Sequence, residues 1–161
     1  MRIVSISENK KIEKRIAVTP DVAKKYIKLG LEVSLQENYG VHLGIKDKEF
    51  EDVGVKILKD EKELINNSDL VVQLGLFSED KLSIIKEGQS IVGMLSPYSN
   101  KEKIDALLKK KINLFSLELL PRITRAQSMD TLSSQANLAG YKAVIESFAN
   151  FEKAIPMMMT A

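Results

Sequence analysis

The chain has 161 residues and a formal net charge of +2; 44% of the residues are apolar and 29% are charged, which is typical of one soluble globular domain. So small a charge, spread over interspersed lysines and acidic residues, gives no reason to expect nucleic-acid binding, and the absence of cysteine excludes disulfides and thiol chemistry. No apolar run approaches a membrane span, and the N-terminus has the pattern of a strand and not of a signal peptide, which predicts a cytoplasmic protein.

The first elements are a strand and a helix. Arg2–Ser7 alternates β-branched and polar residues and predicts a strand, and Glu8–Arg15 is a charged loop. Thr19 is placed as the N-cap of a helix whose first residue is proline, and Gly30 ends that helix. The second strand is predicted at Glu32–Gln36.

Short elements alternate through the middle of the chain. In order, the sequence predicts a helix at 47–53, a strand at 55–58, a helix at 60–66, a strand at 70–74 and a helix at 78–86. Leu70–Leu74 is nearly all apolar, as a strand buried on both faces should be. Gly88 is expected to end the helix before it.

The last third of the chain continues the alternation. Ser90–Leu95 and Ile112–Leu117 are predicted strands, and the helix between them opens on a capping box formed by Ser99 and Glu102. Leu132–Phe151 is the longest predicted helix. Alternating strands and helices predict an α/β fold, a doubly wound, mainly parallel sheet of the flavodoxin/Rossmann-like kind that ends in a long helix. With no internal repeat or linker, residues 1–161 are expected to form a single domain.

One stretch, Pro121–Tyr141, is unlike ordinary scaffold. It holds two arginines, two glutamines, an aspartate and several small hydroxyl residues, and it has few large apolar side chains. Because it follows the last predicted strand, we expect Pro121–Asp130 to be exposed at the carboxyl edge of the sheet, where α/β proteins bind ligands. From composition alone, a solvated loop with Asp130 or Ser133 as helix cap is the alternative interpretation.

The residues of this stretch closely resemble a loop of the NAD(H)-binding alpha subunit of proton-translocating NAD(P) transhydrogenases. The resemblance runs from Arg122 through Gln127, Asp130 and Ser133 to Tyr141, and includes the closing Ile155–Ala161 and the early Arg15–Pro20 motif. It implies that Arg122, Gln127, Asp130 and Ser133 contact NAD(H). It also implies an NADP(H)-binding beta subunit, a membrane subunit, a homodimer of the full alpha subunit, and a cytoplasmic location peripheral to the inner membrane.

The side chains suit hydride transfer between two nicotinamides, which moves no proton at the reacting carbons and instead needs two rings held face to face. Gln127 can donate to and accept from a carboxamide; Asp130 can accept from a carboxamide or a ribose hydroxyl; Arg122 can hold the ring or contact a phosphate. These three residues are therefore the candidates for the catalytic site. No metal-ligand spacing is present, and His42 is expected to be a structural or surface histidine.

Alanine dehydrogenases resemble the chain in fold and in the Arg15 motif, and they are the alternative. They carry a lysine in the region of Val71–Leu74 and a histidine in the region of Leu95–Tyr98, and this sequence has neither. The chain also lacks the GxGxxG fingerprint, so the resemblance implies an N-terminal portion that stops before the Rossmann domain and is inactive alone. A non-catalytic α/β interaction module is a third possibility. Phe148, Phe151 and Met157–Met159 further predict that the last helix projects from the domain or leaves apolar surface bare.

Overall fold

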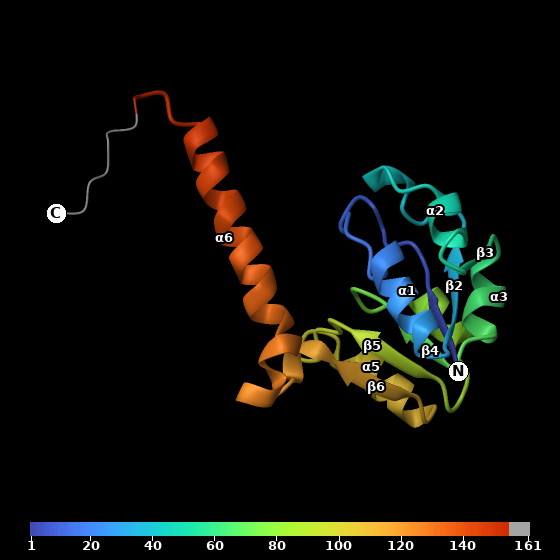
Figure 1. Ribbon diagram of the computed structural model, residues 1–161. Coiled ribbons are helices and arrows are strands. Elements are labelled where there is room, and N and C mark those ends of the chain that lie inside the picture. The colour runs from blue at the N-terminus through green and yellow to red at the C-terminus, as the bar shows by residue number, and fades with distance from the viewer. Residues whose placement is uncertain (155–161) are drawn as a thin grey trace. The chain divides into compact units, whose positions relative to one another are not determined.

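The computed structural model describes residues 1–154, in which the chain divides into two compact units (Figure 1). Unit 1, Met1–Leu119, contains the whole sheet and the helices packed on it. Unit 2 begins at Leu120 and contains the polar loop and the last helix. The predicted Met157–Met159 surface lies outside the described residues.

Unit 1 is built on a six-stranded sheet in the order β3-β2-β1-β4-β5-β6, and every neighbouring pair of strands is parallel. The strands are β1 (Arg2–Ser5), β2 (Glu32–Gln36), β3 (Lys56–Leu58), β4 (Leu70–Val72), β5 (Ser90–Gly93) and β6 (Asn113–Ser116). The chain therefore builds outward from β1 to one edge, crosses back, and builds outward from β4 to the other edge. The predicted parallel α/β sheet is confirmed, and its topological switch point lies between β1 and β4.

The helices alternate with the strands as expected. In unit 1 they are α1 (Pro20–Lys28), α2 (Asp47–Glu51), α3 (Glu61–Asn66), α4 (Glu79–Ile84) and α5 (Lys101–Lys109), and in unit 2 the long helix is α6 (Thr131–Ala149). Short 3-10 turns are η1 (Val41–Leu43), η2 (Leu117–Leu119) and η3 (Thr124–Met129). Because right-handed crossovers on the two sides of the switch point put their helices on opposite faces, the sheet is doubly wound.

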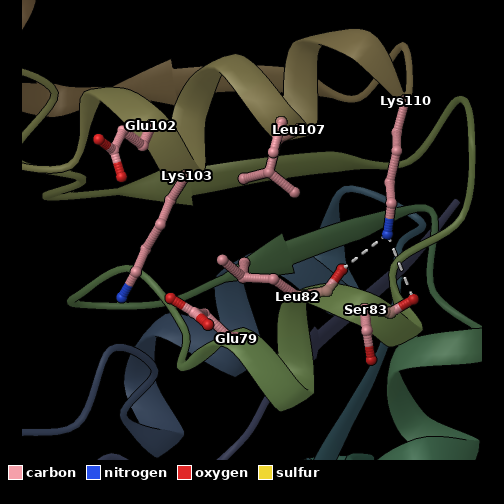
Figure 2. Close-up of a pocket in the computed structure, with 8 residues that line it drawn as sticks. Glu79, Leu82, Ser83, Glu102, Lys103, Leu107 and Lys110 are labelled. Atoms are coloured by element: carbon pink, nitrogen blue, oxygen red, sulfur yellow. Dashed lines mark hydrogen bonds between the residues drawn. The ribbon is translucent and has the colours of Figure 1, made fainter.

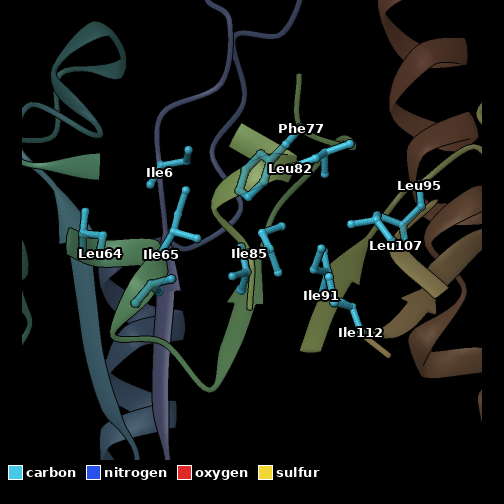
Figure 3. Packing of buried hydrophobic residues seen from close by; sticks show 12 residues of the cluster. Ile6, Leu64, Ile65, Phe77, Leu82, Ile85, Ile91, Leu95, Leu107 and Ile112 are labelled. Carbon is cyan, nitrogen blue, oxygen red and sulfur yellow. The ribbon is translucent and has the colours of Figure 1, made fainter. Parts of the chain in front are cut away.

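Each face of the sheet has its own apolar core. Helices α3, α4 and α5 cover one face, and their side chains interlock with the strands over a cluster that includes Ile65, Leu82, Leu107 and Ile91 (Figure 3). Helices α1 and α2 cover part of the other face. The second core comprises Val18, Ala23, Val33, Leu35, Tyr39, Phe50 and Val55. As parallel sheets require, the central strands are buried from both sides.

Two predicted signals at helix ends, a capping box and a glycine stop, are wrong. Helix α5 begins at Lys101 with Asn100 as N-cap, and the predicted capping box of Ser99 and Glu102 does not form. The amides of Ser99 and Asn100 instead donate to the carbonyl of Ser96 (both 3.0 Å), so a tight turn takes up the residues before the helix. Helix α4 ends at Ile84, before the predicted stop at Gly88, because Ile85 adopts an extended backbone and its side chain is buried.

A buried tyrosine ties the segment after the charged N-terminal loop to strand β1. The Tyr39 hydroxyl lies 2.7 Å from the Ser5 hydroxyl and accepts from the amides of Ala17 (3.0 Å) and Val18 (3.3 Å). The pKa of Tyr39 is raised, mainly by burial. Nearby, His42 Nε2 lies 2.7 Å from the carbonyl oxygen of Lys14, which fits the predicted structural histidine and supplies a partner that the sequence did not reveal.

Candidate functional site

The polar loop of unit 2 is ordered by its own backbone. Residues Thr124–Met129 form the 3-10 turn η3, in which the amide of Ala126 donates to the carbonyl of Ile123 (2.9 Å). Ala126 is buried, whereas the side chains on both sides of it are exposed. The predicted exposure of the loop is therefore confirmed. The 3-10 turn and the buried Ala126 fix the backbone from which the exposed polar side chains project.

Asp130 is the N-cap of helix α6. Its Oδ1 accepts from the amide of Ser133 (3.0 Å) and its Oδ2 from the hydroxyl of Ser133 (2.6 Å). The hydrogen bond from the Ser133 hydroxyl is the main reason why the pKa of Asp130 is lowered; the Ser133 amide and the charge of Arg122 act in the same direction. The structure therefore joins two of the four predicted site residues, Asp130 and Ser133, by hydrogen bonds, and the charge of Arg122 acts favourably on the Asp130 carboxylate.

Gln127 is an exposed polar side chain that takes no part in this cap and is free to meet a ligand. Its backbone carbonyl accepts from the amide of Asp130 (3.3 Å), which ties the two positions together. Within residues 1–154, the side-chain amide of Gln127 makes no hydrogen bond to the protein and is exposed. The carboxylate of Asp130 has one hydrogen bond to each oxygen, so each oxygen can accept one more from a ligand.

Acidification should loosen the start of helix α6. The pKa of Asp130 is lower in the folded chain than its ordinary value of about 3.9, so the cap stabilises the helix fully above that value and is lost as the pH falls through the lower folded-state pKa. Hydrogen exchange and the chemical shift of the Ser133 amide, followed by NMR from neutral to strongly acidic pH, measure the change. Asp130→Asn keeps a neutral cap and should abolish this pH dependence; an unchanged titration of the Ser133 amide in that variant would contradict the assignment.

A second candidate lies in unit 1, at the carboxyl ends of β1, β4 and β5. A cavity of about 330 Å³ opens there, beside the switch point of the sheet. Its lining comprises Glu8, Asn9, Ile12, Glu13, Arg15, Leu74, Gly75, Leu76 and Met94. The Arg15 guanidinium binds Glu13 through Nε (2.9 Å) and Nη2 (2.6 Å), and this hydrogen-bonded pair lowers the pKa of Glu13. Arg15 and Glu13 thus neutralise each other within the loop, and Glu8 adds one further negative charge to the lining.

Two acidic residues that the sequence did not single out fix the loops at this edge. Glu8 Oε1, after β1, accepts from the amides of Leu74 (2.8 Å) and Gly75 (3.2 Å), which follow β4. Glu118, after β6, accepts from the amides of Leu95 and Ser96, which follow β5. Burial raises the pKa of Glu118, but hydrogen bonds from the Ser116 hydroxyl and backbone amides outweigh it and leave the pKa below its ordinary value. Each carboxylate therefore fixes the loop that follows a neighbouring strand. Such a contact can be predicted only when the order of the strands in the sheet is known.

Another hollow, of about 360 Å³, lies between helices α4 and α5 (Figure 2). Lys110 Nζ reaches from the end of α5 to the carbonyl oxygens of Leu82 and Ser83 at 3.4 Å each, at the end of α4. The other polar side chains around it, Glu79, Glu102 and Lys103, are surface groups of the two helices. We interpret it as a packing groove between helices.

The described part of the chain contains neither a metal-binding cluster nor a membrane-spanning helix. Residues 1–154 contain no group of three or more His, Cys, Asp or Glu side chains placed to hold a metal ion. No helix in the same range combines the length and the apolar character needed to span a bilayer.

Comparison with known proteins gives consistent results. The N-terminal domain family of alanine dehydrogenase and PNT matches residues 5–139. A Rickettsia prowazekii protein, named as the first part of NAD(P) transhydrogenase subunit alpha, is 45% identical over 165 residues, covering 100% of this chain and 43% of the relative. The solved transhydrogenase of Sinorhizobium meliloti superposes with a TM-score of 0.88 at 38% identity, covering 99% of this chain and 48% of that one.

The alanine dehydrogenase branch is more distant. The alanine dehydrogenase of Methanococcus maripaludis is 26% identical over 137 residues, which is 85% of this chain and 36% of the relative. In all of these alignments the chain spans less than half of the protein that it matches. The activities of those proteins therefore belong to polypeptides more than twice as long as the stretch matched here.

Proposed function

Because this chain belongs to the alanine dehydrogenase/PNT N-terminal domain family, we propose that it forms the N-terminal portion of the NAD(H)-binding alpha subunit of a proton-translocating NAD(P) transhydrogenase. The observation that carries the proposal is the 45% identity, over the whole chain, to the Rickettsia prowazekii protein whose name assigns it to that subunit. In the proposed enzyme NADP(H) binds to a partner beta subunit, and a membrane subunit couples hydride transfer between the two nucleotides to proton translocation. The alpha subunit lies on the cytoplasmic side as a homodimer.

The loop of unit 2 fits a nicotinamide on chemical grounds. A carboxamide needs a partner that donates and accepts at once, and the exposed Gln127 amide is such a group. Asp130 holds the adjoining helix start and can accept a further hydrogen bond, and Arg122 adds a positive charge. The loop has side chains that can orient a nicotinamide, and residues 121–130 contain no histidine or lysine to take up a proton. Hydride transfer between two nicotinamide rings needs the orientation and no proton acceptor.

The alternative amino-acid dehydrogenase has less support in this geometry. Oxidation of an amine or alcohol needs a base near the substrate. Gln73, which follows β4, is buried and points into unit 1: its Oε1 accepts from the Ser5 hydroxyl (3.2 Å) and the Ile6 amide (3.3 Å), and its Nε2 donates to the Ile6 carbonyl (2.9 Å). Gln73 is thus a structural amide, and the residues that line the cavity at the switch point include no lysine or histidine.

Completion of the subunit tests the proposal. A chimera that joins this chain to the remainder of the Rickettsia prowazekii relative, mixed with an NADP(H)-binding subunit, should transfer hydride from NADH to NADP+, whereas the 161-residue chain alone should not. Turnover of L-alanine by the chimera would favour the dehydrogenase alternative instead. A folded chimera that binds NADH but transfers no hydride would overturn the assignment to a transhydrogenase.

A further inference from the structure

A group of lysines lies at the amino edge of the sheet, where β5 and β6 begin. The turns that enter these two strands are side by side, because the amide of Gly88 donates to the carbonyl of Lys111 (3.2 Å). The two turns carry four exposed lysines and one exposed glutamate: Lys86, Lys109, Lys110, Lys111 and Glu87. In the described part of the chain Asp105, one turn earlier on α5, forms no ion pair with Lys109. Three positive charges therefore remain within these two turns.

Contacts with the protein leave most of this charge in place. Lys111 Nζ pairs with Glu87 (2.8 Å), but the two side chains are 76% and 66% exposed, and such surface ion pairs are weak. Lys86 Nζ donates to a backbone carbonyl oxygen of α3 (3.2 Å), and Lys110 Nζ donates to two of α4 (both 3.4 Å; Figure 2). Because carbonyl oxygens carry no net charge, these contacts hold the ammonium groups without neutralising them.

One of the four lysines has a backbone conformation that glycine adopts at the equivalent positions of the fold. Three strands are preceded, two residues before they begin, by a glycine with positive φ: Gly30 before β2 (79°), Gly54 before β3 (96°) and Gly88 before β5 (85°). Before β6 the same position is Lys111, with a φ of 56°. A side chain costs stability in this region of φ, and glycine does not. A lysine at such a position indicates a use for its charge.

We propose that this basic corner, formed by Lys86 and Lys109–Lys111, binds the anionic surface of a phospholipid bilayer. Lysine ammonium groups are point charges without the fixed hydrogen-bond geometry of arginine, so four of them on adjacent turns suit a diffuse layer of phosphates better than a shaped acidic peptide. Leu108, directly before the run and 53% exposed, adds an apolar side chain of the kind that enters the headgroup region. The inference goes beyond the proposed function, which brings the chain to a bilayer only through partner subunits.

Sedimentation of the 161-residue chain with lipid vesicles tests the basic corner. One set of vesicles is phosphatidylcholine alone, and the other is phosphatidylcholine and phosphatidylglycerol at about 2:1, which supplies an anionic surface. The chain should bind the anionic vesicles at least about tenfold more strongly, since each lysine near such a surface contributes on the order of a fivefold gain. Lys109→Ala removes one of these charges and should lower the partition coefficient for anionic vesicles about fivefold.

Two further variants separate the basic corner from net charge and from stability. Lys10→Ala removes the same charge from an exposed position in the loop at the opposite, carboxyl edge of the sheet, and should leave vesicle binding unchanged. At about 0.1 M salt the Debye length is only about 10 Å, so a lysine at the far edge contributes little. Lys111→Gly should weaken binding to anionic vesicles without lowering the urea unfolding midpoint, because glycine tolerates the positive φ.

Three results would overturn the proposal. Equal binding to neutral and anionic vesicles would assign the binding to exposed apolar side chains such as those of α6. Equal losses in Lys109→Ala and Lys10→Ala would assign it to net charge. If anionic vesicles are not bound and Lys109→Ala weakens assembly of the chimera with the NADP(H)-binding subunit, the partner is an acidic protein surface.

The outcomes also separate the basic corner from the proposed function. A chain that binds anionic vesicles through Lys109, in a case where the chimera transfers no hydride, retains the basic corner and loses the function. A chimera that transfers hydride, together with a chain that does not distinguish the two kinds of vesicle, retains the function and loses the basic corner.

Discussion

Replacing Gly93 by alanine should destabilise unit 1 by more than about 3 kcal/mol, the upper range for overpacking a close contact. Gly93 ends β5, and a Cβ atom placed there would lie 2.2 Å from the carbonyl oxygen of Gln73. The obstacle is backbone, so no side-chain rotation relieves it. Ladder bonds hold both sides: the amide of Gln73 donates to Val92 (3.0 Å), and the amide of Met94 donates to Leu74 (2.9 Å).

Gly75 provides the matched control for this substitution. It lies close by in the loop after β4, its φ is not positive, and a Cβ built there meets no described atom within 4 Å. Gly75→Ala should therefore unfold at nearly the same denaturant concentration as the parent chain, and Gly93→Ala at a much lower one. Urea unfolding of both variants measures the difference. Equal unfolding midpoints would show that β4 and β5 can move apart without loss of stability. The close approach of Gly93 to the Gln73 carbonyl would then not be essential.

Most of the scaffold was predictable because its signals are local. The predicted N-cap of α1 is confirmed, because Thr19 accepts from the amide of Val22. The predicted helix at 60–66 is present, and its first predicted residue, Asp60, proves to be its N-cap and accepts from the amide of Lys62. β2 has the predicted bounds, and the apolar run from Leu70 is a buried central strand. Predictions failed at Ser99 and Gly88, where a turn at Ser96 and the burial of Ile85 decided the helix bounds. Tertiary packing there overrides local propensity.

The site was only partly predictable, for a physical reason. Asp130 as a helix cap follows from its place before Thr131 and Ser133, and the exposure of the loop follows from its composition. Glu8 and Glu118 could not be found, because each binds amides on a strand that is distant in sequence and adjacent only through the sheet order. For the last helix, the apolar side chains Leu138, Tyr141, Val144 and Phe148 are exposed in unit 2, as the prediction of bare apolar surface requires. Phe151, after α6, is also half-exposed.

In the completed subunit, Gln127→Ala should slow hydride transfer on the order of a hundredfold, because a displacement of the ring by about 1 Å is enough for such a loss. NADH binding should change little, since most contacts to the dinucleotide would come from the remainder of the subunit. The Gln127 amide is exposed and bonds no described protein group, so its removal leaves the η3 turn intact. Ser128→Ala, on the same turn and also exposed, is the control and should leave transfer unchanged.

The variants of Asp130 and Arg122 distinguish orientation from binding and from simple loss of the cap. Asp130→Ala removes both the cap and a ligand acceptor, whereas Asp130→Asn keeps a cap, so transfer impaired in both variants points to the carboxylate itself. Arg122→Ala should weaken NADH binding as well as transfer, because a positive charge is lost along with a positioning contact. Single-turnover transfer with the NADP(H)-binding subunit present, alongside NADH titration, separates the two effects. Full hydride-transfer activity in the Gln127→Ala and Asp130→Ala variants would remove both residues from the proposed site.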